Sequence, residues 1–431
     1  MKYASYHTYK LSQIEWLPEV PSHWNVKGLR HVCRFAYGDS LAAENREDGD
    51  IAVYGSNGPV GLHDAANTLA PVIVVGRKGS FGKLNYSTVP VFAIDTTYFV
   101  DTRYTNERMD WLAYALQPLK LDQASKDSAV PGLAREDAYK HKLPVPPLEE
   151  QQTIARFLDA QTARIDTLVA KKRQLIAKLK EKRSALIART VTRGLPPEAA
   201  KATGLAPNPE MKDSGVEWLA ELPTHWQLIS LKRIVEIPIT DGPHETPEFV
   251  DDGIPFASAE AVQNGRVHLA SVRGFITEED HKRYAKKYLP ARRDIYIVKS
   301  GSTTGKVAIV DFDDEFNVWS PLAAVRCDLT KAYPEFMFFA LGSDYFQGLI
   351  QVSWSFGTQP NIGMGVIGDL SVVLPPVDEQ IKIANFLATE TSRLDQLVEK
   401  AECVITRLTE YRQALITSAV TGKIDVREAA A

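Results

Sequence analysis

Two segments of this 431-residue chain are near copies of each other. PPLEEQQTIARFLDAQTARIDTLV begins at Pro146, and PPVDEQIKIANFLATETSRLDQLV begins at Pro375, 229 residues later, with 13 of 24 positions identical. A second pair of phrases opens each half: IEWLPEVPSHWNVKGLR at 14–30 and VEWLAELPTHWQLISLK at 216–232. Because the two pairs alternate along the chain, they predict two equivalent halves, each a globule followed by a helical segment.

The segment after each Pro-Pro pair is predicted to be helical. Proline sets an extended entry, and acidic residues fall in the first turn, near the positive end of the helix dipole. In the first copy we expect a short helix to about Ala160 and a longer one from Thr162, as N-cap, to Gly194. In the second copy the long helix is expected to begin near Thr391 or Ser392 and to end at Gly422.

Apolar residues recur with heptad spacing along both long helices. In the second copy, one core position is occupied by Leu394, Ala401, Leu408 and Leu415, and the other by Leu397, Val404 and Tyr411. The first copy places Ile165, Leu168, Leu175, Leu179 and Leu186 in the same register, interrupted by Lys172 and Lys182. Two matched helices most simply pack on each other as an antiparallel coiled coil with a pseudo-two-fold axis. The alternative is two helices that each pack on their own globule.

The residues between these landmarks predict mixed, strand-rich globules. Short apolar runs such as APVIVV (70–75) are separated by Gly, Asn and Pro turns, and each globule closes with a helical stretch. The predicted fold class is α+β, with two globules separated by the helix pair. We expect the first globule at 1–145, the first helical region at 146–195, a linker and the second globule at 196–374, and the second helical region at 375–431.

Charge and cysteine content restrict the class of protein further. Residues 1–145 carry net charge 0, residues 146–195 carry +6 and residues 196–431 carry −10, which together give the −4 of the whole chain. The three cysteines, Cys33, Cys327 and Cys403, form no disulfide framework and no paired metal-ligand spacing, as expected in a reducing cytoplasm. We expect no signal peptide and no membrane span, because the first residues contain no apolar core segment and no apolar run is long enough to cross a bilayer.

Polar, glycine-bearing loops between apolar strands carry the candidate DNA-binding residues, because side chains and amides there can reach phosphates and base edges. In the first globule, YGSNG (54–58) and GRKGSFGK (76–83) supply Tyr54, Ser56, Asn57, Arg77, Lys78, Ser80 and Lys83. In the second, DGPHETP (241–247), HKRYAKKYLPARR (281–293) and GSTTGK (301–306) supply His244, Lys282, Arg283, Ser302, Thr303, Thr304 and Lys306. Plain strand turns and a solvated helix face remain the alternatives.

No catalytic motif is complete. GSTTGK is similar to a phosphate-binding loop, but Ser300 takes the place of its first glycine and Val307 that of its magnesium-binding hydroxyl. We also find no adenine-methyltransferase box and no supported Ser/Cys–His constellation. The residues predict a binding scaffold without catalytic residues, metal or cofactor.

The duplicated Pro-Pro…Glu-Gln segments resemble the two conserved helical regions of type I restriction–modification specificity subunits (HsdS). EWLPEVPSHW and EWLAELPTHW resemble the openings of that family's target recognition domains. YGSNG…VGRKGSFGK…DTTYFV and DGPHETP…GSTTGKVAIV resemble two of its domain types. The resemblance covers essentially the whole chain. One departure is ARRD (291–294), where the family leads us to expect glycine before the aspartate.

This resemblance implies a non-catalytic subunit that reads a bipartite, asymmetric DNA target, one domain per half-site, with the helix pair setting the gap. The implied partners are double-stranded DNA, two methylation subunits and, where the system has them, two motor/nuclease subunits. S-adenosylmethionine would belong to the methylation subunits, and ATP and magnesium to the motor subunits. A coiled-coil adaptor with two protein-binding globules is the alternative from another class.

Overall fold

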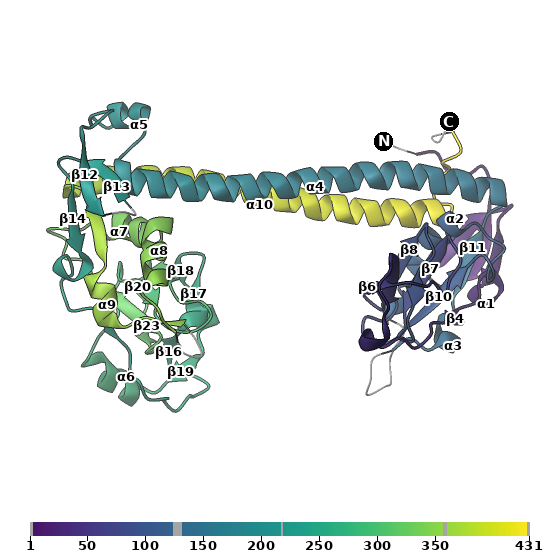
Figure 1. Cartoon of the computed structure of the whole chain (residues 1–431), viewed down its shortest axis with the longest axis horizontal. Coiled ribbons are helices and arrows are strands. Elements are labelled where there is room, and N and C mark those ends of the chain that lie inside the picture. The colour runs from purple at the N-terminus through teal and green to yellow at the C-terminus, as the bar shows by residue number, and fades with distance from the viewer. Residues whose placement is uncertain (1–2, 124–131, 217–218, 357–359, 429–431) are drawn as a thin grey trace. The chain divides into compact units, whose positions relative to one another are not determined.

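The computed structural model describes residues 3–123, 132–216, 219–356 and 360–428, and it divides into two compact units (Figure 1). The first unit comprises Met1–Arg173 and Glu402–Ala431, and the second comprises Gln174–Ala401. Each unit contains one globule of mixed sheets together with part of helix α4 (Leu148–Arg193) and part of helix α10 (Val377–Val420). The predicted α+β class with two globules and two long helices is confirmed.

The globule of the first unit is built on two small sheets. An antiparallel four-stranded sheet has the order β4-β10-β7-β8, and a three-stranded sheet has the order β6-β5-β9. Their strands are β4 (Ala36–Tyr37), β10 (Thr97–Asp101), β7 (Val72–Gly76), β8 (Leu84–Ser87), β6 (Gly58–His63), β5 (Ile51–Gly55) and β9 (Phe92–Ala93). The helices are α1 (Leu29–Val32), α2 (Met109–Ala115) and α3 (Arg135–Ala138). All residues of β7 and β10 are buried, because both faces of the sheet are covered.

The globule of the second unit has a different strand order. A six-stranded sheet runs β15-β23-β20-β21-β18-β17, and a three-stranded sheet runs β19-β16-β22. Their strands are β15 (Thr240–Asp241), β23 (Leu322–Val325), β20 (Ile295–Val298), β21 (Val307–Ile309), β18 (Arg266–Val267), β17 (Val262–Gln263), β19 (Gly274–Ile276), β16 (Ile254–Ala257) and β22 (Asn317–Val318). A further pair is β24 (Ser355–Phe356) and β25 (Pro360–Asn361), and the helices are α5 (Pro197–Ala202), α6 (Glu278–Ala285), α7 (Pro334–Leu341), α8 (Asp344–Val352) and α9 (Met364–Asp369).

Each globule opens with a hairpin and closes with a two-stranded ribbon. The hairpins are β1 (Tyr9–Ile14) with β2 (Leu17–Pro21), and β12 (Met211–Val216) with β13 (Leu219–Pro223). The ribbons pair β3 (Asn25–Gly28) with β11 (Lys142–Val145), and β14 (Gln227–Ser230) with β26 (Ser371–Leu374). Each ribbon therefore brings the opening phrase of a half to the start of the long helix that ends it. Glu217 and Trp218 of the second phrase lie outside the described residues.

Both long helices are continuous, so the predicted division of the helical segment into two helices is wrong. Neither α4 nor α10 contains glycine or proline. Thr162 and Thr391, at the expected start of the second helix, do not cap it; their hydroxyls donate to carbonyls three or four residues earlier in the same helix. The predicted ends are confirmed, since Gly194 and Gly422 follow the helices with positive φ of 87° and 74°.

The buried seam of the two helices follows one predicted heptad position and shifts the other by one residue. Ile165, Leu394, Ala401 and Leu415 are buried, and Leu179, Leu186 and Leu408 are partly buried. The second position is occupied by the partly buried Val169, Ile176, Val398 and Ile405 instead of Leu168, Leu175, Leu397 and Val404, which are 37–42% exposed. A heptad alternates steps of three and four residues, so the order of the steps decides which neighbour turns inward. In α4 the seam residue after Ile165 is Val169, four positions later, instead of Leu168, three positions later. The predicted seam residues that are displaced in this way form apolar positions on the surface.

One ion pair joins α4 and α10 in each unit. In the first unit Arg412 Nε lies 3.0 Å from Asp166 Oδ1, and in the second Arg183 Nε lies 3.0 Å from Asp395 Oδ1. The two aspartates are 229 residues apart, as are the two arginines, so the same pair forms twice with the helices exchanging roles. Within each unit the helices are therefore antiparallel.

A glutamate in the first turn of each long helix holds the histidine of the opening phrase. Glu150 accepts the hydroxyl of Tyr6 at 2.5 Å and lies 2.8 Å from His23 Nε2. In the second unit, Glu379 lies 2.9 Å from His225 Nε2 and accepts the indole N–H of the adjacent tryptophan at 3.0 Å. Burial and the Glu150 carboxylate raise the pKa of Tyr6, so its hydroxyl stays protonated and donates.

The glutamine that follows each glutamate fixes a helix of the globule. Gln151 Oε1 accepts the backbone N–H of Arg108 at the start of α2 at 2.9 Å, and Gln380 Oε1 accepts that of Tyr333 at the start of α7 at 2.7 Å. Each amide group also donates to the carbonyl of the proline at the helix entry. We call this Glu-Gln pair with its partners the clamp; it explains why the helical phrase and the opening phrase are repeated together.

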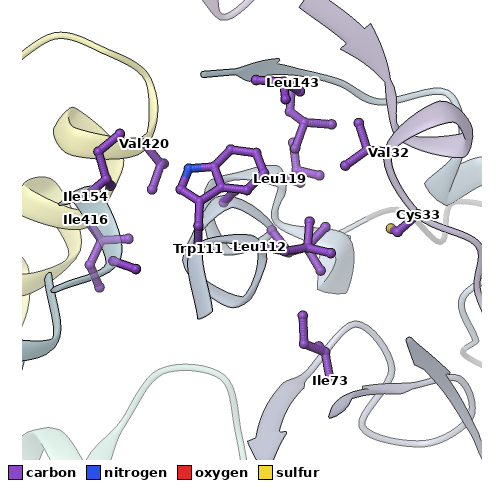
Figure 2. Close-up of a cluster of buried hydrophobic side chains, with 14 of the residues drawn as sticks. Val32, Cys33, Ile73, Trp111, Leu112, Leu119, Leu143, Ile154, Ile416 and Val420 are labelled. Carbon is purple, nitrogen blue, oxygen red and sulfur yellow. The ribbon is translucent and has the colours of Figure 1, made fainter. Parts of the chain in front are cut away.

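The core of the first unit extends from the sheet to both long helices. Figure 2 shows the fully buried Trp111 of α2 beside Ile154 of α4 and beside Ile416 and Val420 of α10. Burying side chains of this size contributes roughly 1.5–3 kcal/mol each. The globule, α4 and α10 of this unit therefore share one hydrophobic core.

At the ARRD turn, Arg293 has a positive φ of 72°, a conformation that glycine adopts without strain. Its guanidinium Nη2 lies 2.5 Å from Glu335 Oε2, and its guanidinium carbon lies 4.8 Å from the centre of the Tyr333 ring. The backbone therefore takes the left-handed form that a glycine at this position would suit, and the arginine side chain gains two contacts of its own.

Removing the amide of Gln380 is expected to destabilise the second unit strongly. Gln380 is fully buried, and Gln380→Ala leaves the partly buried Tyr333 N–H and the carbonyls of Lys331 and Pro375 without the hydrogen bonds that its amide makes. Each buried group left unpaired costs about 1–3 kcal/mol, so we expect a loss of about 2–4 kcal/mol in the free energy of unfolding, measured by urea titration of the full chain. The control is Gln396→Ala on the exposed side of α10, expected to change stability by less than about 0.5 kcal/mol. Equal stability of the two variants would contradict the role of the clamp.

Candidate nucleic-acid interface

In the first unit, the two predicted loops meet at the backbone of residues 95–96. The Ser56 hydroxyl donates to the Thr96 carbonyl at 2.8 Å, and the backbone N–H groups of Arg77 and Lys78 donate to the same oxygen at 2.9 and 3.2 Å. The Arg77 guanidinium donates to the Asp95 carbonyl at 3.1 Å. The structure thus brings together the candidates from 54–58 and 76–83.

Lys83 links the same loops from the other side. Its Nζ donates to the backbone carbonyl of Asn57 at 2.8 Å and to the Asn57 side-chain oxygen at 2.7 Å. Asn57, Ser80 and Lys83 line an open hollow of about 580 Å³ on the surface of this unit. Tyr54, by contrast, is partly buried and packs on a small apolar cluster under the sheet, so its ring mainly supports the loop.

The cations of this group are held by neutral partners. Arg77 and Lys83 bond to carbonyl oxygens, and within the described part of the chain no carboxylate forms an ion pair with Arg77, Lys78 or Lys83. Their positive charge is therefore not cancelled locally and remains available to an anion such as DNA phosphate.

In the second unit, His244 belongs to a group around the buried carboxylate of Asp241. His244 Nε2 and Lys299 Nζ each lie 3.0 Å from Asp241 Oδ2, and Lys287 Nζ lies 2.6 Å from Oδ1. Burial acts to raise the pKa of Asp241, but the hydrogen bonds from Lys287 and Lys299 outweigh it, so the pKa is lowered and the group stays ionised. Two lysines on one carboxylate leave net positive charge at this loop.

Lys282 and Arg283 on α6 are already ion-paired. Lys282 Nζ lies 3.1 Å from Glu278, and Arg283 Nη2 lies 2.8 Å from Glu245 and 2.6 Å from Asp280. The Glu245 contact attaches α6 to the loop of His244. Their charges are more compensated than those of the first-unit candidates, which reduces the attraction that each can exert on phosphate.

The remaining second-unit candidates form the turn between β20 and β21. The Thr304 hydroxyl donates to the Gly301 carbonyl at 2.8 Å, and the Thr303 carbonyl accepts the Lys306 N–H at 3.1 Å. Ser302 and Lys306 are exposed. The turn begins just after Lys299, whose side chain bonds to Asp241, so Lys299 connects the turn to the group around His244.

Sequence reasoning missed Asp241 and Lys299 in the second unit, and Tyr37 and Arg135 in the first; Lys287 lies in the basic stretch 281–293 that the sequence does indicate. Asp241 lies within the quoted phrase DGPHETP, but nothing in the sequence reveals that its side chain is fully buried. Tyr37 lies on a two-residue strand whose partner is about sixty residues away, so no local pattern indicates it.

Grouped metal ligands and membrane-crossing helices are both absent from the residues that the structure describes. Among the residues that it describes, no three His, Cys, Asp or Glu side chains group as metal ligands. No helix within the same ranges is long and apolar enough to cross a membrane.

Comparison with known proteins identifies one family. The type I restriction modification DNA specificity domain matches residues 21–178 and 223–406, which is most of the chain and one match in each half. The type I restriction enzyme MjaVIII specificity subunit of Methanocaldococcus jannaschii is 23% identical over 375 residues, covering 85% of this chain and 79% of that protein. The EcoBI specificity subunit of Escherichia coli is 22% identical over 356 residues, covering 82% and 73%.

A solved structure shares the fold. It comes from work on complex assembly and conformational transition of the type I restriction–modification system, and it matches 94% of this chain and 99% of its own with a TM-score of 0.65 and 16% identity.

Proposed function

The chain belongs to the type I restriction–modification DNA specificity family, and we propose that it reads a bipartite, asymmetric DNA target with one half-site for each globule. The observation that carries this proposal is the duplicated clamp. The same Glu-Gln pair attaches a globule with a four-stranded sheet in one half and a globule with a six-stranded sheet in the other. Equivalent attachment of two different globules is the arrangement that suits two different half-sites.

The second part of the proposal is that two methylation subunits bind equivalent surfaces of the helices. The residues displaced from the seam leave exposed apolar side chains at repeat-related positions: Leu168 in the first unit corresponds to Leu397 in the second. Exposed apolar groups of this size favour a protein partner. Two repeat-related patches fit two copies of one partner, and motor/nuclease subunits would join that complex where the system has them.

In this proposal the chain itself is not an enzyme. Residues 1–145 and 196–374 serve as the target recognition domains, and residues 146–195 and 375–431 as the helical regions. S-adenosylmethionine is assigned to the methylation subunits, and ATP and magnesium to the motor subunits, so this chain holds no cofactor. Base flipping before methylation would also belong to the partner.

The test is DNA binding by the complex of this chain with its methylation subunit. Affinity for duplex DNA is expected to fall steeply with salt, because bound Lys and Arg release counterions from the phosphates. A selected duplex should bind at least about a thousandfold more tightly than a scrambled one. Binding that is weak and independent of salt would instead support the protein-binding adaptor.

Arg77 is expected to read a base in the first half-site. Arginine donates two parallel hydrogen bonds to guanine, and Arg77→Ala should cost about 1–3 kcal/mol and relax one base position. The measurement is binding to cognate and single-mismatch duplexes. Lys140→Ala is the control: it removes the same charge from the same unit, but Lys140 is already bound to Asp137 at 2.6 Å. If Arg77→Ala keeps full discrimination, the loop at 76–83 does not read bases.

A further inference from the structure

Tyr37 lies at the edge of the four-stranded sheet with two arginines over its ring. The guanidinium carbon of Arg77 is 4.9 Å from the ring centre, and that of Arg135 is 5.1 Å from it. The tyrosine is 47% exposed. The Arg135 Nε is 3.8 Å from the Glu136 carboxylate, too far for a hydrogen bond, and has no hydrogen-bond partner among the residues that the structure describes. Neither guanidinium is therefore closely neutralised.

The Tyr37 ring is held in place by the neighbouring strand β10. Tyr37 is paired directly with Tyr98 of β10, and the two ring centres are 5.1 Å apart. Tyr98 is buried, donates its hydroxyl to the Leu133 carbonyl at 3.0 Å, and stacks on Phe35. The next residue, Gly38, passes so close to the backbone of Ile94 that a Cβ there would lie 2.1 Å from its carbonyl oxygen. The backbone at Tyr37 therefore has little freedom to move.

We infer that Tyr37 is a positioning residue for DNA recognition, which holds Arg77 and Arg135 ready for the target; this inference rests on the proposed contact of Arg77 with DNA. A free arginine side chain loses much rotational freedom when it binds, and one already held in place loses less. The ring face attracts the guanidinium through its π electrons and, unlike a carboxylate, leaves the positive charge uncancelled. A guanidinium held over a ring can still present N–H groups at its edge to guanine O6 and N7.

The decisive substitution removes the ring. Tyr37→Leu, in the complex with the methylation subunit, is expected to lower discrimination between cognate and mismatched duplexes about five- to tenfold at the half-site read by the first unit. Tyr37→Phe keeps the ring and should stay within about twofold of wild type. Discrimination at the other half-site should not change. The ring-removing control is Tyr86→Leu on β8, since Tyr86 is exposed on the same sheet and no arginine lies over its ring among the described residues.

A double variant tests whether Tyr37 acts through the arginine. If it does, the loss of discrimination in Tyr37→Leu combined with Arg77→Ala should be smaller than the sum of the two single losses, because the effects of coupled residues do not add. If Tyr37→Leu discriminates between duplexes as well as wild type while Arg77→Ala does not, Tyr37 does not position Arg77 and the inference is wrong. The proposed function is not affected by that result. Strictly additive losses overturn the inference as well. If thermal melting shows that Tyr37→Leu does not fold, Tyr37→Gln is tested in its place, and the same loss of discrimination is expected.

Discussion

Exchanging residues 29–141 for the corresponding segment of another family member is expected to replace one half-site completely and leave the other unchanged. These limits lie just inside the ribbon of β3 and β11, so both strands stay with their native partner. Gln151 accepts a backbone N–H of the exchanged segment, which any residue except proline supplies. The clamp should therefore hold the new globule as it held the old one.

The matching exchange in the second half is residues 231–370, inside the ribbon of β14 and β26. Each chimera is expressed with the methylation subunit, and the methylated sequence is read from the host genome. We expect the two chimeras to alter opposite halves of the target. A single exchange that alters both halves would show that the globules do not read independently.

Lengthening both long helices by seven residues is expected to widen the permitted gap between the half-sites. The insertions are placed after Lys178 and after Glu399, which the ion pair of Arg183 with Asp395 places opposite each other in the second unit. Seven residues add about 10 Å of helix and nearly two whole turns, so the seam stays in register. Each long helix carries residues of both units, so the length of the helices should determine the gap between the two half-sites. We expect this gap to grow by about three base pairs.

An insertion of four residues after Lys178 alone is the disruptive control. It adds about 6 Å to one helix only and moves Arg183 away from Asp395. This variant should methylate poorly or accept only a longer gap, with both half-sites unchanged. If the doubly extended protein methylates DNA with the original gap, the helices do not set the spacing.

The sequence predicts the repeated elements well because their signals are local. The Glu-Gln phrase, the Pro-x-His-Trp phrase and the heptads are short patterns, and Gly194 and Gly422 mark where the helices end. The sequence does not reveal the continuity of α4, because Thr162 is of a residue type that commonly caps the start of a helix. One position of the predicted seam is off by one residue, because Leu168 and Val169 are both apolar and the heptad pattern fits either of them.

The candidate site was harder to predict because its contacts are distant in sequence. Ser56, Arg77 and Thr96 are brought together only by the pairing of strands far apart in the chain. The stacking of Tyr37 with Arg135 joins residues almost one hundred positions apart. Composition marks polar, glycine-bearing loops, but it does not reveal whether a cation in such a loop is already neutralised, as Arg283 is.

The most direct test is to sequence the methylated genome of a host that expresses this chain with its methylation subunit and compare it with a host expressing the methylation subunit alone. We expect methylated adenines in one new motif, made of two different specific half-sites separated by a fixed number of unspecified base pairs. The 29–141 chimera should change one of those half-sites only. A continuous or palindromic motif, or the same methylation with and without this chain, would show that the chain does not read a bipartite target.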